Sequence, residues 1–329
     1  MMTALARLLI TTILVGLVSC GLGRGPGITP VRTSFNRGVY HYSRGDLDAA
    51  QSEFRAALDE DASDHRARFN LALVYDEKAR HAHDAQLNED GSTWTKRARE
   101  QYLQLLDGRP QHLRAQVNLA AIEYENGDKG AARERLRQAL GSHDDSALAR
   151  VALASLLFRD SRTSGTADLG ESLLLLDAAL SLDTAHTEAN WLLGECHRYL
   201  AEHERREGQA AAVEKHITAA RQAYVRLLDG SPDDLAGLMA IATLELEAKR
   251  YVDSIVWLER VVHIDPDHRQ AHVLLANALE HTGDLEGATS HLWAARRLTR
   301  EPDRAGAFRD RLISLYQRLQ KIEAPGSSQ

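Results

Sequence analysis

Apolar residues recur along the chain in paired helical stripes that are separated by short polar turns. From Val31 onward the pattern repeats with a period near 34 residues, and each period holds two segments whose apolar positions lie three and four residues apart. That spacing places the apolar side chains on one face of an α-helix. A helix pair of this kind cannot bury its apolar face alone, so neighbouring pairs must stack. The sequence therefore predicts an all-α fold of stacked antiparallel helix pairs.

Seven periods can be marked, and each holds two positions that accept only small residues. The ranges are 31–64, 65–112, 113–146, 147–186, 187–234, 235–268 and 269–302. The eighth residues are Gly38, Ala72, Ala120, Ala154, Gly194, Ala242 and Ala276, and the small residues of the second segments are Ala50, Ala98, Ala132, Ser172, Ala220, Ser254 and Ala288. Four residues later stand the bulky residues Phe54, Tyr102, Leu136, Leu176, Tyr224, Leu258 and Leu292. We expect the small residues at close helix crossings and the bulky ones wedged between helices.

The turns inside three periods carry matching signals. Gly45-Asp46, Gly127-Asp128 and Gly283-Asp284 each place a residue that tolerates positive φ before a residue that can cap the next helix. Each pair therefore predicts a tight turn followed by an N-cap.

Taken together, these residues resemble the tetratricopeptide repeat family over nearly all of the chain after Val31. The resemblance implies a right-handed α-solenoid of seven helix pairs with a capping helix at 303–323, which a solenoid needs at its end. The cap's apolar stripe is Phe308, Leu312, Leu315, Tyr316 and Leu319. Repeat 1 departs from the family pattern with Arg37 at a usually apolar site, and several repeats lack the terminal proline. Residues 324–329 are expected to be a disordered tail.

Repeats 2 and 5 each carry fourteen extra residues between their two helices. Their second helices also match at an offset of 122 residues, as in Tyr102 and Tyr224. A three-repeat block is therefore expected to have been duplicated, with repeat 7 appended. The extra residues continue the helical pattern, which predicts two long helix pairs with tips near Asn88–Ser92 and Glu207–Gln209. Two disordered loops are the alternative.

The first 19 residues have the pattern of a secretory signal peptide. Arg7 precedes an apolar run from Leu8 to Val18, which is shorter than the about 20 residues that cross a bilayer. The run ends in Leu17-Val18-Ser19-Cys20, which resembles the lipobox of bacterial lipoproteins. The resemblance implies cleavage before Cys20, its lipidation, and, because Gly21 is not aspartate, attachment to the periplasmic leaflet of the outer membrane. An ordinary signal peptide with a chance cysteine is the alternative.

Residues 20–30 are expected to be the lipidated cysteine and a flexible tether. The segment is rich in glycine between Gly21 and Gly27. Its GxG pattern follows the signal peptide and no strand, so it lacks the context of a dinucleotide-binding fingerprint.

Composition and charge exclude some classes of protein. Apolar residues make up 43% and charged residues 26%, which is typical of a globular chain. The net charge is −7, and basic and acidic residues are spread along the chain, which argues against a nucleic-acid partner. With Cys20 lipidated, Cys196 has no partner for a disulfide, so the fold must be held by packing. We expect Cys196 to be a buried structural thiol.

No pattern typical of catalysis or of a cofactor stands out. His81 and His83 are two residues apart and point to different helix faces, and His268 falls in a turn four residues before His272. The fifteen histidines lack clustered cysteine or carboxylate partners. We therefore expect no catalytic residue, no cofactor and no metal site. A periplasmic enzyme with an acidic cleft is the alternative from another class.

The resemblance also implies where a partner would bind, because the first helices of such repeats line a concave face. Positions 2 and 6 of the first three repeats pair Arg32 with Asn36, Arg66 with Asn70, and Arg114 with Asn118. Arginine suits a carboxylate and asparagine suits an extended backbone, which predicts an acidic or C-terminal peptide there. Comparable positions later in the chain hold Trp191, Met239, Leu246 and Val273, which predict an apolar floor. The alternative is that the asparagines are common repeat-family residues and the arginines are solvated.

The expected function is a lipid-anchored scaffold or adaptor of the bacterial cell envelope that binds other envelope proteins or their peptide segments. Neither nucleic acid nor a small-molecule substrate is expected. The chain resembles lipoproteins of this repeat family that assist type IV pilus assembly or organise peptidoglycan hydrolases. Its repeat count and its insertions differ from both. The alternative within binding proteins is a subunit of an outer-membrane export or pilus machine.

Overall fold

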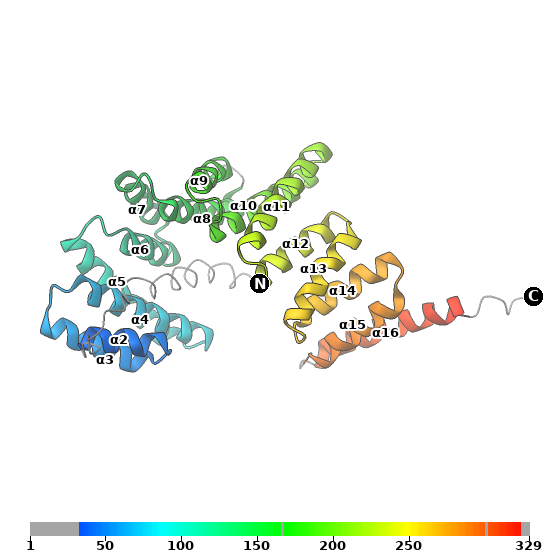
Figure 1. Ribbon diagram of the computed structural model, residues 1–329, viewed down its shortest axis with the longest axis horizontal. Coiled ribbons are helices and arrows are strands. Elements are labelled where there is room, and N and C mark those ends of the chain that lie inside the picture. The colour runs from blue at the N-terminus through cyan, green and yellow to red at the C-terminus, as the bar shows by residue number, and fades with distance from the viewer. Residues whose placement is uncertain (1–32, 166–167, 300–301, 324–329) are drawn as a thin grey trace, which may run out of the picture. The chain divides into compact units, whose positions relative to one another are not determined.

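The computed structural model describes residues 33–165, 168–299 and 302–323. The predictions for the signal peptide, Cys20, the tether, Arg32 and the tail 324–329 lie outside these residues. The described part of the chain forms fifteen helices and contains no strand (Figure 1). They are α2 (Ser34–Ser43), α3 (Leu47–Glu60), α4 (His65–Asp84), α5 (Asn88–Gly108), α6 (Leu113–Glu125), α7 (Lys129–Ser142), α8 (Ala147–Ser164), α9 (Leu169–Leu182), α10 (Thr187–Arg206), α11 (Ala210–Gly230), α12 (Leu235–Glu247), α13 (Tyr251–Ile264), α14 (Arg269–Thr282), α15 (Leu285–Arg297) and α16 (Pro302–Glu323).

The helices pack mainly on their neighbours in sequence. The contacts within the pairs α2–α3, α4–α5, α10–α11 and α14–α15 are followed by contacts between one pair and the next, as between α3 and α4. The helix α16 packs on α15, at the place expected for a cap. Within the described residues this confirms the all-α solenoid of helix pairs. We propose that the seven ranges marked in the sequence are its repeats.

The chain divides into two compact units, Met1–Asp160 and Ser161–Gln329, and the boundary falls inside α8. We call them unit 1 and unit 2. The core of unit 1 contains Phe54 and Tyr102, both fully buried. The core of unit 2 contains Tyr224 and Leu258, which are also fully buried. Each unit therefore has its own hydrophobic core.

Small residues stand where the two helices of a pair cross. All fourteen small positions and all seven bulky positions found in the sequence are buried, which confirms both predictions. The two glycines show why size matters. A Cβ added to Gly38 would lie 2.7 Å from the ring of Phe54, and one added to Gly194 would lie 2.3 Å from the ring of Tyr224. The side chain of the second helix thus occupies the place of the missing Cβ.

The turns inside the pairs need a left-handed backbone. Gly45, Gly127 and Gly283 have φ values of 76°, 92° and 89°, as their sequence predicted. The N-cap prediction is confirmed where the side chains of Asp46 and Asp284 accept hydrogen bonds from backbone N–H groups of the next helix. Asp128 is also the N-cap residue of α7, but its carboxylate makes no capping bond.

The extra residues of repeats 2 and 5 extend helices and form no irregular loop. The pair α4–α5 has 20 and 21 residues, as does the pair α10–α11. The tip expected at Glu207–Gln209 is confirmed between α10 and α11. The tip expected at Asn88–Ser92 is wrong, because the helices turn at residues 85–87 and Gly91 lies inside α5. A Cβ on Gly91 would lie 2.6 Å from the ring of His83 on α4, so this glycine permits close packing and does not break the helix.

The offset of 122 residues seen in the sequence is also present in the helices. The bounds of α4, α5, α6 and α7 recur, 122 residues on, as those of α10, α11, α12 and α13. Residues of the two blocks can therefore be compared one by one. Where equivalent positions carry different side chains, the two units can differ in their hydrogen bonds and ion pairs.

Candidate functional site

Two first helices of unit 1, α6 and α8, border a shallow groove. A hollow of about 50 Å³ lies between α6 and α8. Its walls include Asn118, Ala121 and Tyr124 of α6 and Ala152, Ser155 and Arg159 of α8. The alanines and the serine leave the space open, and the larger polar side chains stand around it.

The aromatic wall of this groove is fixed by charges at its end. The guanidinium of Arg159 lies 4.1 Å from the centre of the Tyr124 ring, a cation–π contact. The Tyr124 hydroxyl donates to Asp160 over 3.1 Å, and Lys129 and Arg133 pair with the same carboxylate at 2.9 and 3.0 Å. Burial opposes ionisation of Asp160, but these hydrogen bonds outweigh it and lower its pKa. Tyr124 is therefore held in one position.

A second polar chain joins α6 to α4 through a core tyrosine. The Asn118 amide donates to the hydroxyl of Tyr102 over 2.9 Å, and that hydroxyl donates to Asp76 over 2.6 Å. Burial raises the pKa of Asp76 to about 7, helped by the charge of Glu125 and opposed by the Tyr102 bond and by Arg80. The sequence predicted Tyr102 as a wedge but gave no sign that its hydroxyl reaches this carboxylate.

The arginine and asparagine residues predicted at the groove have different surroundings. Asn36 is exposed at the start of α2, and Arg114 is half-buried on α6. Arg66 is exposed, with its guanidinium 4.8 Å from the centre of the Phe35 ring and 3.5 Å from Asp64. The printed contacts of Arg66 are with its own chain, so binding of a ligand by these residues stays a prediction.

The side-chain amides of repeats 2 and 3 donate hydrogen bonds within the protein. Asn70 donates to the backbone oxygen of Arg66 over 2.8 Å, whereas Asn118 donates to Tyr102. Asn118 therefore takes part in the fold as well as lining the hollow.

Sequence comparison assigns the chain to a family. A model of the tetratricopeptide repeat matches residues 35–90, 95–134, 122–174 and 205–268, which together cover more than half of the chain. The chain belongs to the tetratricopeptide repeat family. Such proteins generally mediate protein–protein interaction. None of the curated proteins matches the chain in sequence.

Several solved structures are similar to the chain at low sequence identity. A tetratricopeptide repeat protein from Parabacteroides merdae is 13% identical, with 86% of this chain and 96% of that chain covered and a TM-score of 0.52. YrrB, described as having an unusual peptide-binding site, is 12% identical over 64% of this chain and 97% of its own, with a TM-score of 0.47. PilF from Pseudomonas aeruginosa is 15% identical over 84% and 96%, also with a TM-score of 0.47. Identities this low bear on the fold alone.

The apolar residues predicted in the second half of this tetratricopeptide chain all lie in unit 2. Trp191, Met239 and Leu246 are partly buried and pack against the core of that unit. Val273 is also partly buried. Part of each side chain therefore serves the fold, and contact with a ligand stays a prediction.

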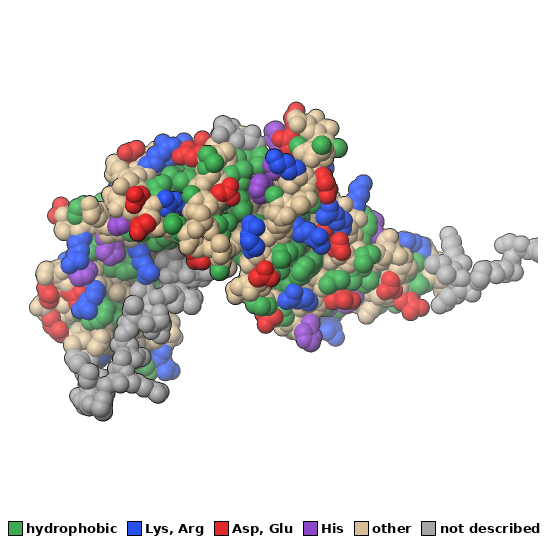
Figure 2. All heavy atoms as spheres, turned by 45° about the horizontal axis from the view of Figure 1, so that its top comes forward, with side chains coloured by type: hydrophobic (Ala, Val, Ile, Leu, Met, Phe, Trp, Pro, Cys, Tyr) green, Lys and Arg blue, Asp and Glu red, His purple; other side chains and the backbone are tan. Residues whose placement is uncertain are grey.

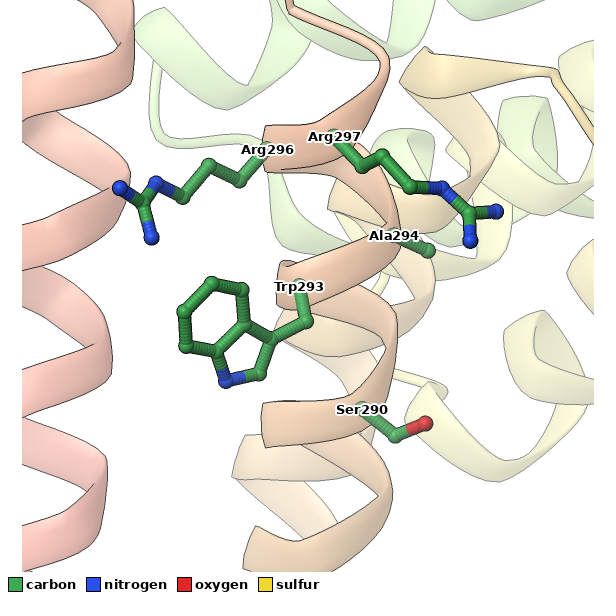
Figure 3. Close-up of a pocket in the computed structure, with 5 residues that line it drawn as sticks. All are labelled: Ser290, Trp293, Ala294, Arg296 and Arg297. Atoms are coloured by element: carbon green, nitrogen blue, oxygen red, sulfur yellow. The ribbon is translucent and has the colours of Figure 1, made fainter.

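A larger hollow lies over α15. This helix is the second of its pair, and the sequence predicted no binding surface on it. Its volume is about 630 Å³, and Ser290, Trp293, Ala294, Arg296 and Arg297 line it (Figure 3). Trp293 is 44% exposed and donates to the Tyr316 hydroxyl over 3.0 Å. Figure 3 shows Trp293 and Arg296 on one side of α15 and Arg297 on the other. A tryptophan followed three and four residues later by arginines was the signal available in the sequence. Because one helix supplies all five residues, the hollow is an open surface.

The histidines of the tetratricopeptide repeats serve several purposes. His81 is exposed, with Nε2 3.2 Å from Glu77. The Nδ1 atom of His268 accepts from the N–H of Ala271 and so caps α14, and His272 lies 3.0 Å from His291 between their Nδ1 atoms. In the part of the chain that the structure describes, no group of three or more His, Cys, Asp or Glu could hold a metal ion.

Cys196 is fully buried beside Gly194, which confirms the prediction of a buried thiol. Burial raises the pKa of the Cys196 thiol to about 12, which keeps it protonated and poorly reactive. Its sulfur lies 3.8 Å from the Ser172 hydroxyl of α9, between one helix pair and the next.

The visible surface mixes both signs of charge. Figure 2 shows basic and acidic side chains interspersed over both units. None of the described helices combines the length and the apolar character that a membrane span needs.

Proposed function

We propose that the chain is a lipid-anchored scaffold or adaptor of the bacterial cell envelope and that it binds a peptide segment of an envelope protein in the groove of unit 1. The observation that carries the proposal is the hollow between α6 and α8, which stands between two first helices and has polar groups on its walls. Shallow grooves that combine small, aromatic and hydrogen-bonding side chains suit extended peptides. We further propose that the groove binds and does not catalyse.

The envelope location is supported by the first 20 residues of the sequence. The apolar run and the segment Leu17-Val18-Ser19-Cys20 have the order of a lipoprotein signal. We place the mature chain at the periplasmic leaflet of the outer membrane, held by the lipid on Cys20.

Changing Cys20 to alanine is expected to move the protein from the membrane fraction into a soluble or unprocessed pool. The reason is that the acyl chains attached to this sulfur provide the lasting anchor. Fractionation of cells followed by mass spectrometry of the N-terminus measures both location and cleavage. A matched control is Ser19→Ala, which keeps a small residue before the cysteine and should fractionate as the wild type does. Membrane attachment and unchanged cleavage of the Cys20→Ala protein would contradict the lipid anchor.

The groove can be tested with the triple variant Arg66→Ala, Asn70→Ala and Arg114→Ala. Asn118 is left in place because it holds Tyr102. We expect capture of the envelope partner by crosslinking to fall at least about fivefold, which corresponds to about 1 kcal/mol of binding free energy. The control variant replaces two exposed arginines at the second helix, Arg99 and Arg109, and should capture the partner normally.

Circular dichroism should show the same helical content and melting temperature for both variants. Equal capture by the triple variant and the wild type would remove the arginine and asparagine residues from the binding surface.

A further inference from the structure

The duplicated blocks contain two equivalent tyrosines whose hydroxyls meet a carboxylate at the inner helix of the same pair. Tyr102 of unit 1 donates to Asp76 over 2.6 Å, and Tyr224 of unit 2 donates to Glu195 over 2.6 Å. Because the helix bounds of the two blocks coincide at an offset of 122 residues, Asp76 is equivalent to Arg198. A carboxylate in one unit thus stands where a guanidinium stands in the other.

In unit 2 that arginine completes a closed network. Arg198 pairs with Glu195 through its Nε and Nη2 atoms at 3.3 and 2.9 Å. Its Nη1 atom pairs with Glu247 at 3.3 Å. One cation therefore joins two carboxylates that come from neighbouring first helices, α10 and α12.

In unit 1 one of the two acids is kept, a leucine (Leu73) stands in place of Glu195, and an acid stands in place of the cation. Glu125 is the counterpart of Glu247, and Asp76 replaces Arg198. Within the described residues, no Lys or Arg side chain lies within 4.0 Å of either carboxylate as an ion pair. The nearby bases have other contacts, since Arg80 pairs with Glu77 and Arg159 lies over Tyr124.

A further polar group of the same cluster makes no hydrogen bond within the described residues. The buried hydroxyl of Tyr42 on α2 has no hydrogen-bond partner among the described residues. Burial raises the pKa of Tyr42 to about 12, with Arg80 acting against it and Asp76 adding to it. Burial likewise raises the pKa of Asp76 to about 7, although the Tyr102 hydroxyl donates to its carboxylate. A donor from outside the chain would satisfy both Asp76 and Tyr42.

We propose that unit 1 accepts a basic side chain, arginine or lysine, from the bound peptide segment at Asp76 and Glu125, in the place that Arg198 fills in unit 2. The inference rests on the proposed peptide-binding function and names the chemistry of its ligand. A guanidinium has the planar fork that unit 2 already uses between two carboxylates. Unit 2 carries its cation within the chain as Arg198, whereas the described part of unit 1 has Asp76 at that position.

The position of the acids fits an extended segment that crosses the first helices. Arg66 and Arg114 stand in the first turn of α4 and α6, whereas Asp76 and Glu125 stand further along the same two helices. An acidic group of the segment would meet the first pair and a basic side chain would meet the second. The two ends of the groove thus select opposite charges.

Selection of a random ten-residue peptide library displayed on phage tests the proposal with the full chain as target. Against the wild type, we expect enrichment of peptides that carry at least one arginine or lysine. Chosen synthetic peptides should bind Asp76→Asn or Glu125→Gln about tenfold more weakly. Asp76→Asn keeps an oxygen that can accept from Tyr102, and melting temperatures check that both variants fold. Asp76→Arg places a cation within the chain, as in unit 2, and should abolish the preference for basic peptides.

Two outcomes would overturn the inference in distinguishable ways. Enriched peptides without a basic preference, or equal binding to the wild type and the folded Asp76→Asn and Asp76→Arg variants, would remove the cation site and leave peptide binding intact. Failure of the wild type to enrich any peptide would count against the proposed groove itself, and the cation site would fall with it.

Discussion

Replacing Gly194 with valine is expected to lower the free energy of unfolding of unit 2 by about 3 kcal/mol or more. A Cβ at this position would lie 2.3 and 2.7 Å from the Cε1 and Cδ1 atoms of Tyr224, well inside van der Waals contact. The ring cannot move aside easily, because it is fully buried and its hydroxyl is bound to Glu195. The branched side chain must therefore push α10 and α11 apart.

Gly194→Ala should have a smaller effect, about 1 kcal/mol. Unit 1 shows the reason, because Ala72 occupies the equivalent position opposite Tyr102 and the helix pair accommodates its methyl group. Urea unfolding followed by circular dichroism measures the series.

Gly170→Val in α9 is the control. Nothing lies within 4 Å of a Cβ built on Gly170, so this change should cost well under 1 kcal/mol. Similar losses for Gly194→Val and Gly170→Val would show that the crossing with Tyr224 does not set the cost.

The helix pairs could be predicted from the sequence because close crossings impose strict limits on size. Only small residues fit where two backbones approach, so a position such as Ala120 or Ser254 repeats in every pair. The apolar stripes give the same pairs independently. Two signals of different physical origin therefore agreed over the whole array.

The turns were predicted less well because glycine is only one way to reach a left-handed backbone. Gln86 and Lys249 adopt φ values of 61° and 60° at the turns of their pairs, where other pairs hold glycine. Residues 85–87 contain no glycine, so the first tip was predicted near Gly91, which lies inside α5. A glycine required for packing and a glycine required for a turn look alike in a single sequence.

The candidate site was only partly visible in the sequence. Its helices and the residue Asn118 followed from the repeat positions, since these fix which side chains reach the inner face. The role of the Asp76 carboxylate could not be predicted, because no pattern in the neighbouring sequence shows that Tyr102, 26 residues away, donates to it. Charge networks between helices depend on which long side chains meet, and the repeat pattern leaves that open.

Replacing Arg221 with leucine is expected to destabilise unit 2 by about 2–3 kcal/mol. The side chain of Glu245 is fully buried, and the Nε atom of Arg221 pairs with its Oε1 atom at 2.6 Å. Without Arg221 the buried carboxylate keeps only Arg250, whose Nη1 atom lies 3.6 Å from Oε2. That weaker contact reduces the cost below the full penalty of an unpaired buried charge.

The duplicated block supplies a matched control for this change. The counterpart of Arg221 is Arg99, which is exposed, and the counterpart of Glu245 is Glu123. Glu123 is held instead by Arg135 of α7, with bonds of 2.9 and 2.7 Å. Arg99→Leu should therefore change the stability by less than about 0.5 kcal/mol, whereas Arg135→Leu should cost as much as Arg221→Leu.

Removing the buried charge as well separates an ion-pair effect from a packing effect. In the double variant Arg221→Leu with Glu245→Leu, the buried carboxylate is removed together with Arg221, and we expect most of the lost stability to return. Urea unfolding of the two single variants and the double variant gives the coupling energy between the two residues. A double variant that is as unstable as the sum of the single variants would mean that Arg221 stabilises α11 and α12 through its packing, and that Glu245 needs no partner from α11.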